Sequence, residues 1–178
     1  MSMTGDFLIT KEFLKTLSPC TDGYRWFCET YPDGGKYQEI LDRLCELDRF
    51  CDARWLLDKV GATNDVLEID SIDDKEKNIC FAGTIIARKD LILKNIKAGG
   101  FIKAGKSIKA GKSIEAGEYI EVGEYIEAGE CIKAGEDYGV YAGLRMRISD
   151  MKESGYVKAQ EKPKNLMCGY WEGEGYEI

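Results

Sequence analysis

Residues 96–137 read IKAGGFIKAGKSIKAGKSIEAGEYIEVGEYIEAGECIKAGED, and this stretch decides the fold. The frame I-x-A-G-x-x recurs every six residues, with valine once in place of alanine. Side chains alternate across a β-strand, so the isoleucine and the small residue two places later face the same side. Each unit therefore predicts a short strand, and its glycine predicts a corner that needs a positive φ or a close backbone approach. The isoleucines are Ile96, Ile102, Ile108, Ile114, Ile120, Ile126 and Ile132.

A single six-residue unit cannot bury its apolar face alone. Repeated units solve this by coiling, so that each strand lies about 4.8 Å from the strand one turn earlier. The repeat therefore predicts a parallel β-solenoid.

The charges of the repeat predict the length of a turn, because they change from lysine to glutamate in one block. Three units per turn place six pairs of opposite charge in vertical register and leave one like pair, Glu118 with Glu136. Two units per turn give five opposite and four like pairs, and stacked like charges are destabilising. We therefore expect a three-sided coil with about 18 residues per turn and about four turns between Ile79 and Met151. The six pairs are Lys97–Glu115, Lys103–Glu121, Lys109–Glu127, Glu115–Lys133, Lys106–Glu124 and Lys112–Glu130.

The two halves of the chain have different periods, which indicates an α+β protein. Apolar residues recur at helical spacing between residues 10 and 60, with Thr10 as an N-cap and Gly61 as a C-cap. We predict a helical head over 1–64 that caps the first turn of the coil. The β-solenoid follows over 65–150, with its core at 96–137, and a C-terminal cap or tail over 151–178.

The net charge of −7 resides entirely in residues 1–78, which hold 17 acids and 10 bases. A nucleic-acid binder normally carries a basic face, so direct binding of nucleic acid is not expected. No apolar run approaches the length of a membrane span, so no membrane association is expected either. The N-terminus lacks the features of a signal peptide. These features favour a protein of the host cell cytoplasm.

Catalytic chemistry has no clear basis in the sequence. Histidine is absent, which removes the Ser-His and Cys-His pairs and the commonest general base. Seven scattered cysteines without a CxxC motif indicate neither zinc nor a disulfide framework, and most are expected to be buried. We predict no catalytic residue, no metal and no cofactor.

A protein-contact surface is the remaining candidate site. Charge ladders account for most of the lysines and glutamates, but Tyr119 and Tyr125 stand where the lysine block has Ser107 and Ser113. Tyrosine is enriched at interfaces, so an acidic, tyrosine-bearing ledge is a candidate surface for a protein partner. The chain itself is expected to be a monomer or a small homo-oligomer. The candidate residues are Glu115, Glu118, Tyr119, Glu121, Glu124, Tyr125, Glu127 and Glu130.

The two halves together resemble a class of uncharacterised phage and prophage proteins. The resemblance lies in a head with FLKTLSPCTDGYRWF and DARWLLDKVG, followed by repeats such as IKAGKSIEAGEY. The chain is also loosely similar to pentapeptide-repeat proteins and bactofilins, both β-solenoids. It differs from the former in its period of six and from the latter in its large head. The resemblance implies a phage context.

Three functional hypotheses follow. The first is a non-catalytic inhibitor of phage origin that obstructs a host defence complex, such as an anti-CRISPR protein that blocks nucleic-acid binding by an effector. Its acidic head favours this role, although the mixed Lys/Glu ladder imitates phosphate poorly. The second is a self-assembling or virion-associated solenoid, because an open coil has unpaired strand edges. The third is an enzyme that uses carboxylates on the solenoid wall.

Overall fold

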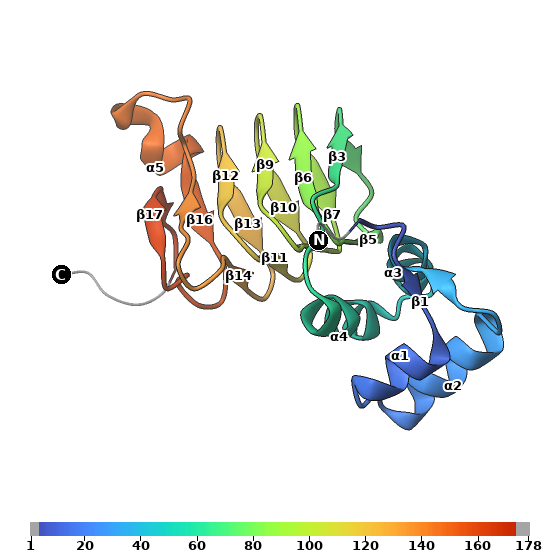
Figure 1. Cartoon of the computed structure of the whole chain (residues 1–178). Helices are drawn as coiled ribbons and strands as arrows, with labels where there is room; N and C mark the ends of the chain where they lie inside the picture. The colour runs from blue at the N-terminus through green and yellow to red at the C-terminus, as the bar shows by residue number, and fades with distance from the viewer. Residues whose placement is uncertain (1–3, 174–178) are drawn as a thin grey trace.

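A computed structural model describes residues 4–173 and shows a helical head beside a parallel β-solenoid (Figure 1). The head begins with a small antiparallel ladder of two short strands, β1 (Leu8–Ile9) and β2 (Gly35–Lys36). Its helices are α1 (Lys11–Thr16), α2 (Thr21–Thr30), α3 (Tyr37–Glu46) and α4 (Phe50–Val60). The side chain of Thr10 caps α1, as predicted, by accepting a hydrogen bond from the backbone of Phe13 at 3.2 Å.

The solenoid has three parallel sheets and about six turns of roughly 18 residues. The first sheet contains β3 (Val66–Ile69), β6 (Thr84–Ala87), β9 (Ile102–Ala104), β12 (Ile120–Val122), β15 (Val140–Tyr141) and β17 (Leu166–Cys168). The second contains β4 (Ile72–Asp73), β7 (Leu91–Leu93), β10 (Ile108–Ala110), β13 (Ile126–Ala128), β16 (Tyr156–Lys158) and β18 (Tyr170–Trp171). The third contains β5 (Asn78–Phe81), β8 (Asn95–Ala98), β11 (Ile114–Ala116) and β14 (Ile132–Lys133). A 3-10 helix, η1 (Ile148–Asp150), and α5 (Met151–Ser154) separate β15 from β16.

The predicted turn length is confirmed by the strand register. Ile120 pairs with Ile102, and Glu121 pairs with Lys103, so paired residues stand three units apart in the sequence. The isoleucines of the frame face inward and form one continuous apolar core. The number of turns was underestimated. The coil begins at β3, before the regular repeat, and it continues through β18, within the segment that we expected to be a cap or tail.

Close backbone approach, and not a positive φ, explains six of the seven repeat glycines, and Gly111 is the exception. Among the described residues, the glycines with positive φ are Gly34, Gly61, Gly143 and Gly169, all outside the repeat. A Cβ added to Gly117 would lie 2.0 Å from the backbone oxygen of Gly99, one turn below. A side chain at this corner would therefore separate neighbouring turns.

The head lies at the first turn of the coil, as predicted, and its helices pack against the first strand of the third sheet. Both α3 and α4 contact β5. The Gln38 amide donates to the backbone oxygen of Cys80 at 3.0 Å and accepts from the backbone of Ala82 at 2.9 Å. It thereby takes the place of a neighbouring strand at this edge. The first strands of the other two sheets, β3 and β4, each have a neighbour on one side only among the described residues.

Helix α4 also extends over the outer face of the third sheet. Lys97 and Glu115 point outward from this sheet but are buried beneath α4. Lys97 Nζ lies 2.7 Å from Asp58 of α4, and Glu115 Oε1 lies 3.2 Å from Nη1 of Arg54 in a geometry that makes no hydrogen bond. The head and the solenoid are therefore joined by apolar packing and by ion pairs whose solenoid members, Lys97 and Glu115, are buried.

Candidate binding groove

The eight residues predicted as one partner surface form a ring around the coil. Glu115 belongs to the third sheet, Glu121 to the first and Glu127 to the second. Glu118 and Tyr119, Glu124 and Tyr125, and Glu130 lie at or beside the three corners between them. One flat partner cannot contact all three faces of the coil, so the prediction of a single acidic ledge does not match this arrangement. The same three-unit turn that pairs the charges also disperses the glutamates.

The lysine block neutralises most of this ring. Lys103 lies 2.7 Å from Glu121, Lys109 lies 2.9 Å from Glu127, and Lys112 lies 3.7 Å from Glu130. Glu115 is 4 % exposed and lies 3.2 Å from Lys97, so it is not available at the surface. The other two predicted pairs, Glu115–Lys133 and Lys106–Glu124, are neighbours in adjacent turns without a close charge contact.

The two tyrosines of the glutamate block form stacks along the coil. Tyr119 stacks on Phe101 at 4.5 Å between ring centroids, and Tyr125 stacks on Tyr156 at 4.8 Å. Aromatic stacking between turns explains part of their presence without a partner. Tyr119 has a second role, because it also lines a surface groove.

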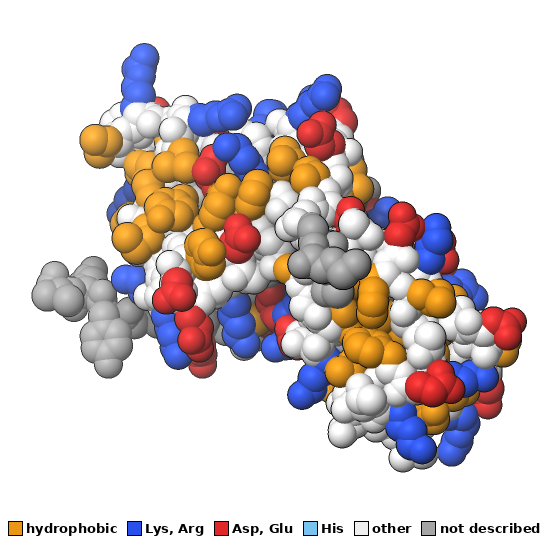
Figure 2. All heavy atoms as spheres, in the orientation of Figure 1, with side chains coloured by type: hydrophobic (Ala, Val, Ile, Leu, Met, Phe, Trp, Pro, Cys, Tyr) orange, Lys and Arg blue, Asp and Glu red, His pale blue; other side chains and the backbone are white. Residues whose placement is uncertain are grey.

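This groove lies on the outer face of the first sheet, toward its C-terminal end, and has a volume of about 620 Å³. Figure 2 shows hydrophobic side chains gathered on this face of the solenoid, with acidic side chains among them. Three tyrosines and two apolar side chains provide most of the apolar surface. The lining consists of Tyr119, Glu121, Glu136, Asp137, Tyr138, Gly139, Tyr141, Lys164, Asn165, Leu166 and Met167.

The backbone around the groove is held by hydrogen bonds. The Asn165 amide donates to the backbone oxygens of Glu136 at 3.0 Å and Tyr138 at 2.8 Å, which fixes the turn that carries the acids. Gly139 is buried beneath the ring of Tyr141 and the side chain of Met167. A Cβ at residue 139 would lie 2.5 Å from Met167 and 2.9 Å from Tyr141. The glycine therefore allows both side chains to lie close to the sheet.

The groove has an excess of acids, with three carboxylates and one lysine, Lys164, in its lining. The exposed carboxylates of Glu136 and Asp137 make no ion pair within the part of the chain that the structure describes, whereas Glu121 is paired with Lys103. Partial burial, together with the nearby charge of Glu121, raises the pKa of the Tyr119 hydroxyl. An aromatic wall beside unpaired carboxylates attracts a cation, because ring faces and carboxylates both carry negative potential.

Most residues of the groove were missed by the sequence analysis. The predicted ledge included Tyr119 and Glu121, but not Glu136, Asp137, Tyr138 or Tyr141. The available signal was the change after Asp137, where the six-residue frame ends and aromatic residues follow within four positions. Met167 and Lys164 join the groove only through the path of the chain in later turns.

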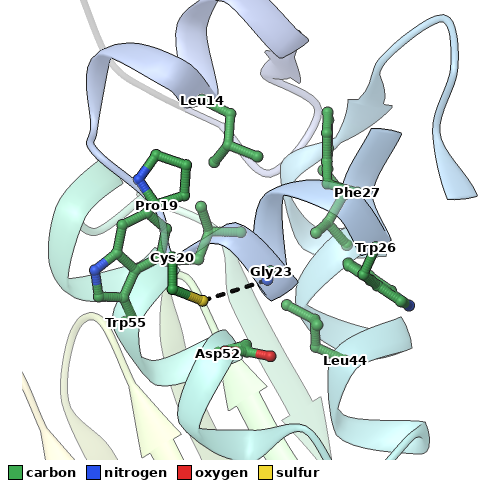
Figure 3. A pocket seen from close by; sticks show the side chains of 11 residues that line it. Leu14, Pro19, Cys20, Gly23, Trp26, Phe27, Leu44, Asp52 and Trp55 are labelled. Carbon is green, nitrogen blue, oxygen red and sulfur yellow. Dashed lines mark hydrogen bonds between the residues drawn. The ribbon is translucent and has the colours of Figure 1, made fainter. Parts of the chain in front are cut away.

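A second cavity lies in the helical head and is apolar (Figure 3). Leu14, Trp26, Phe27 and Trp55 line it, and Cys20 lies at its side with Sγ accepting a hydrogen bond from the backbone of Gly23 at 3.3 Å. Its volume of about 80 Å³ is well below the roughly 300–1,000 Å³ of typical ligand pockets. Its small size and apolar lining are those of a packing defect in the head and not of a ligand site.

The described residues offer no metal-binding cluster, and their thiols differ in burial. Within residues 4–173, no cluster of three or more acids or cysteines is arranged to hold a metal ion, and no helix is long and apolar enough to cross a membrane. Only Cys45 and Cys80 of the seven cysteines are buried, so the expectation that most are buried was wrong. Burial raises the pKa of the Cys45 thiol to about 12, which makes this thiol unreactive.

Comparison with known proteins finds a similarity for the head alone. A family model described as the YdhT N-terminal domain matches residues 1–63, so the helical head is similar to that domain. The match ends before β3 and leaves out the solenoid and the groove. No curated protein and no solved structure matches the chain.

Proposed function

We propose that this protein is a non-catalytic binding protein whose acidic, aromatic groove takes a lysine or arginine side chain from a protein partner. The proposal rests on two carboxylates that make no ion pair among the described residues, those of Glu136 and Asp137, next to the exposed ring of Tyr138. All three belong to one turn that is fixed to the rigid first sheet by Asn165.

A guanidinium group suits this groove better than other ligands. It can stack on a tyrosine ring while its N–H groups donate to a carboxylate. A cation over an aromatic ring contributes about 0.5–2 kcal/mol, depending on its exposure. Because the groove is open to solvent, we expect one or two such contacts to provide specificity within a larger interface.

We further propose that the partner is a nucleic-acid-binding complex of the host, with a CRISPR effector as the leading class, and that the protein is of phage origin. Such complexes present lysine and arginine side chains along the path of the nucleic acid. The head and first turn carry the entire net charge of −7, which attracts a basic surface over a longer range. The neutralised ring of the middle turns would contribute little to this attraction.

A direct test measures binding of a fluorescein-labelled hexa-arginine peptide, with a hexa-citrulline peptide of the same shape as the uncharged control. We expect the wild type to bind the arginine peptide and D137N/E136Q to bind it several-fold more weakly. E130Q/E124Q is the matched control, since it removes the same charge at corners outside the groove. Equal weakening by both double variants would show that only net charge matters and would overturn the groove assignment.

The partner class needs a second experiment. DNA binding by a purified CRISPR effector is measured with increasing amounts of the protein, and phage plating is measured on a host with an active CRISPR system. Inhibition that Y138A weakens and E130Q does not would support the proposal. Unchanged DNA binding and unchanged plating would reject the CRISPR assignment, while the peptide experiment would still test the groove.

A further inference from the structure

At the end of the coil nearest the head (Figure 1), the inward side chains of the first turn have no further turn to cover them. The equivalent side chains of the next turn, such as those of Ile85 and Leu91, are fully buried. In the first turn they are only partly buried, although they pack against the same core. A solenoid buries its interior by stacking turns, so this end has room for one more apolar layer. The first-turn residues are Leu67, Ile69, Ile72 and Ile79.

The same end of the coil has two open strand edges. The strands β3 and β4 begin the first and second sheets, and each has a neighbouring strand on one side only among the described residues. At β3, the backbone oxygens of Asp65 and Ile69 accept hydrogen bonds from the next turn at 2.9 and 3.1 Å. Successive backbone groups of a strand point to opposite edges, so those of Val66 and Glu68 point to the open edge. β3 therefore presents backbone donors and acceptors for one more strand.

A hollow of about 590 Å³ is lined by this first turn and by α3 of the head. Its volume is within the roughly 300–1,000 Å³ of typical ligand pockets. The four partly buried side chains of the first turn provide its apolar lining. The hollow therefore joins an apolar floor to an open strand edge. Its charged lining residues are Asp42, Glu46, Asp74, Glu76 and Lys77.

The charge around this hollow favours a basic partner. Residues 37–46 and 65–78, which form α3 and the first turn, hold nine acids and three bases. Glu46 is paired with Arg43 at 2.9 Å, but Glu68, Asp74 and Glu76 make no ion pair within the described part of the chain. Nucleic acid would be repelled by these carboxylates, and the same end of a second copy carries the same acids.

We infer that a protein partner adds an extended segment to the open edge of β3, and that apolar and basic side chains alternate in this segment. Every second side chain of a strand faces the same side, so one set would cover Leu67 and Ile69 in the hollow. The other set would lie beside the exposed carboxylate of Glu68, where a basic side chain forms a favourable cross-strand pair.

The added segment thus supplies one more layer of the coil, as in other cases of strand addition to a sheet edge. The site is assigned to β3 because β3 has four residues, whereas β4 has only two. This inference is independent of the proposed function, since no residue of the hollow lines the groove.

The first experiment measures binding of a fluorescein-labelled hexapeptide of alternating leucine and lysine by fluorescence anisotropy. E68P removes an N–H that points to the open edge, and proline is tolerated in edge strands. We expect E68P to weaken binding at least about tenfold, because a backbone acceptor of the peptide loses its donor. E68Q is the matched control: it removes the same charge but keeps the N–H, so it should weaken binding much less. Thermal unfolding verifies that both variants are folded.

The second experiment changes the peptide and leaves the protein unaltered. N-methylation of either the three leucines or the three lysines blocks the backbone donors along one edge of the peptide. A strand pairs with β3 through one edge only, so one methylated peptide should lose binding and the other should retain it. Equal effects of the two methylations would overturn strand addition, whatever the stability of E68P.

A third set of measurements separates this site from the groove and from self-association. D74N/E76Q should weaken binding of the leucine–lysine peptide several-fold, whereas E130Q/E124Q, which removes the same charge elsewhere on the coil, should not. Weakening by D137N/E136Q and not by D74N/E76Q would assign the peptide to the groove and overturn the inference. In sedimentation velocity the protein alone should be a monomer. A dimer that E68P dissociates would show that a second copy occupies the edge, and would also overturn the inference.

Discussion

Gly111 and Gly117 hold the same position of the six-residue frame, but their surroundings differ. A Cβ on Gly117 would lie 2.0 Å from a backbone oxygen, whereas a Cβ on Gly111 would have no atom nearer than 3.9 Å. The turn beneath Gly111 is one residue shorter, since Ile108 pairs with Leu91 and not with Asp90. The sequence left open whether these glycines serve a positive φ or a close approach, and the structure assigns close approach at Gly117.

Substitution of these two glycines by alanine should therefore give opposite results. We expect G117A to lower the free energy of unfolding by about 1–3 kcal/mol, because the neighbouring turns must separate. G111A should be neutral, or more stable by about 0.4–1 kcal/mol, because alanine restricts the unfolded chain. Urea unfolding monitored by circular dichroism compares the two, and equal destabilisation would show that the frame itself requires glycine.

Asp48 connects the head to the solenoid through its carboxylate. It accepts hydrogen bonds from Lys94 Nζ at 2.7 Å and from Asn78 Nδ2 at 2.8 Å. Both hydrogen bonds lower the pKa of the Asp48 carboxyl, and the bond from Lys94 has the larger effect. A group with a lowered folded-state pKa contributes stability above its unfolded pKa, and this contribution is lost as the pH falls through the folded pKa.

We therefore expect D48N to reduce the pH dependence of stability below about pH 4, where the unfolded aspartate takes up its proton. Asparagine tolerates the positive φ of 55° at this position, so the backbone should be retained. Urea unfolding at a series of acidic pH values measures the effect. K94M removes the main cause of the shift and should reduce the same part of the pH dependence; an unchanged profile in both variants would contradict the prediction.

At the scale of elements, the third sheet differs from the other two because α4 covers it. Lys97 and Lys103 are equivalent in the frame, and each faces a glutamate of the next turn. The side chains of Lys97 and Glu115 are 11 % and 6 % exposed, whereas those of Lys103 and Glu121 are 40 % and 30 % exposed. No local pattern in the repeat distinguishes these faces, so the burial of Glu115 could not be predicted from the sequence.

K97M should therefore destabilise the protein far more than K103M. Removal of one partner from a buried pair costs about 3–5 kcal/mol. Arg54 stays near Glu115 in this variant and offsets part of that loss of stability at most. An exposed pair contributes only about 0.2–1 kcal/mol, so K103M should lie within that range. Chemical unfolding of both variants in the same buffer gives the comparison, and losses of similar size would show that α4 does not isolate the third sheet from water.

At the scale of the whole molecule, the three-sided coil could be predicted because the spacing of opposite charges in the sequence reports which residues stack in adjacent turns. Opposite charges that stand three units apart in the sequence meet only if the turn holds three units, and Lys103 and Glu121 do meet. The number of turns and the groove were not predictable in this way. They depend on irregular strands such as β15 and β17, where the frame is absent and only the path of the preceding turns determines which residues meet.

The coil also predicts which deletions the molecule tolerates. Removal of residues 103–120 takes out one complete turn and joins Ile102 to Glu121, so every later side chain keeps its face. Lys133 then lies above Lys97, and the variant therefore carries Lys133→Glu to restore an opposite pair.

Removal of residues 103–117 with the same substitution shifts the frame by three positions and turns the later isoleucines outward. We expect the first deletion to unfold cooperatively, with a β-sheet circular dichroism spectrum. The second should bind a hydrophobic dye and lack a cooperative transition, because charged side chains would occupy the core. If both variants behave alike, the interior of the coil does not depend on the three-unit register, and stacked turns cannot be what holds the molecule together.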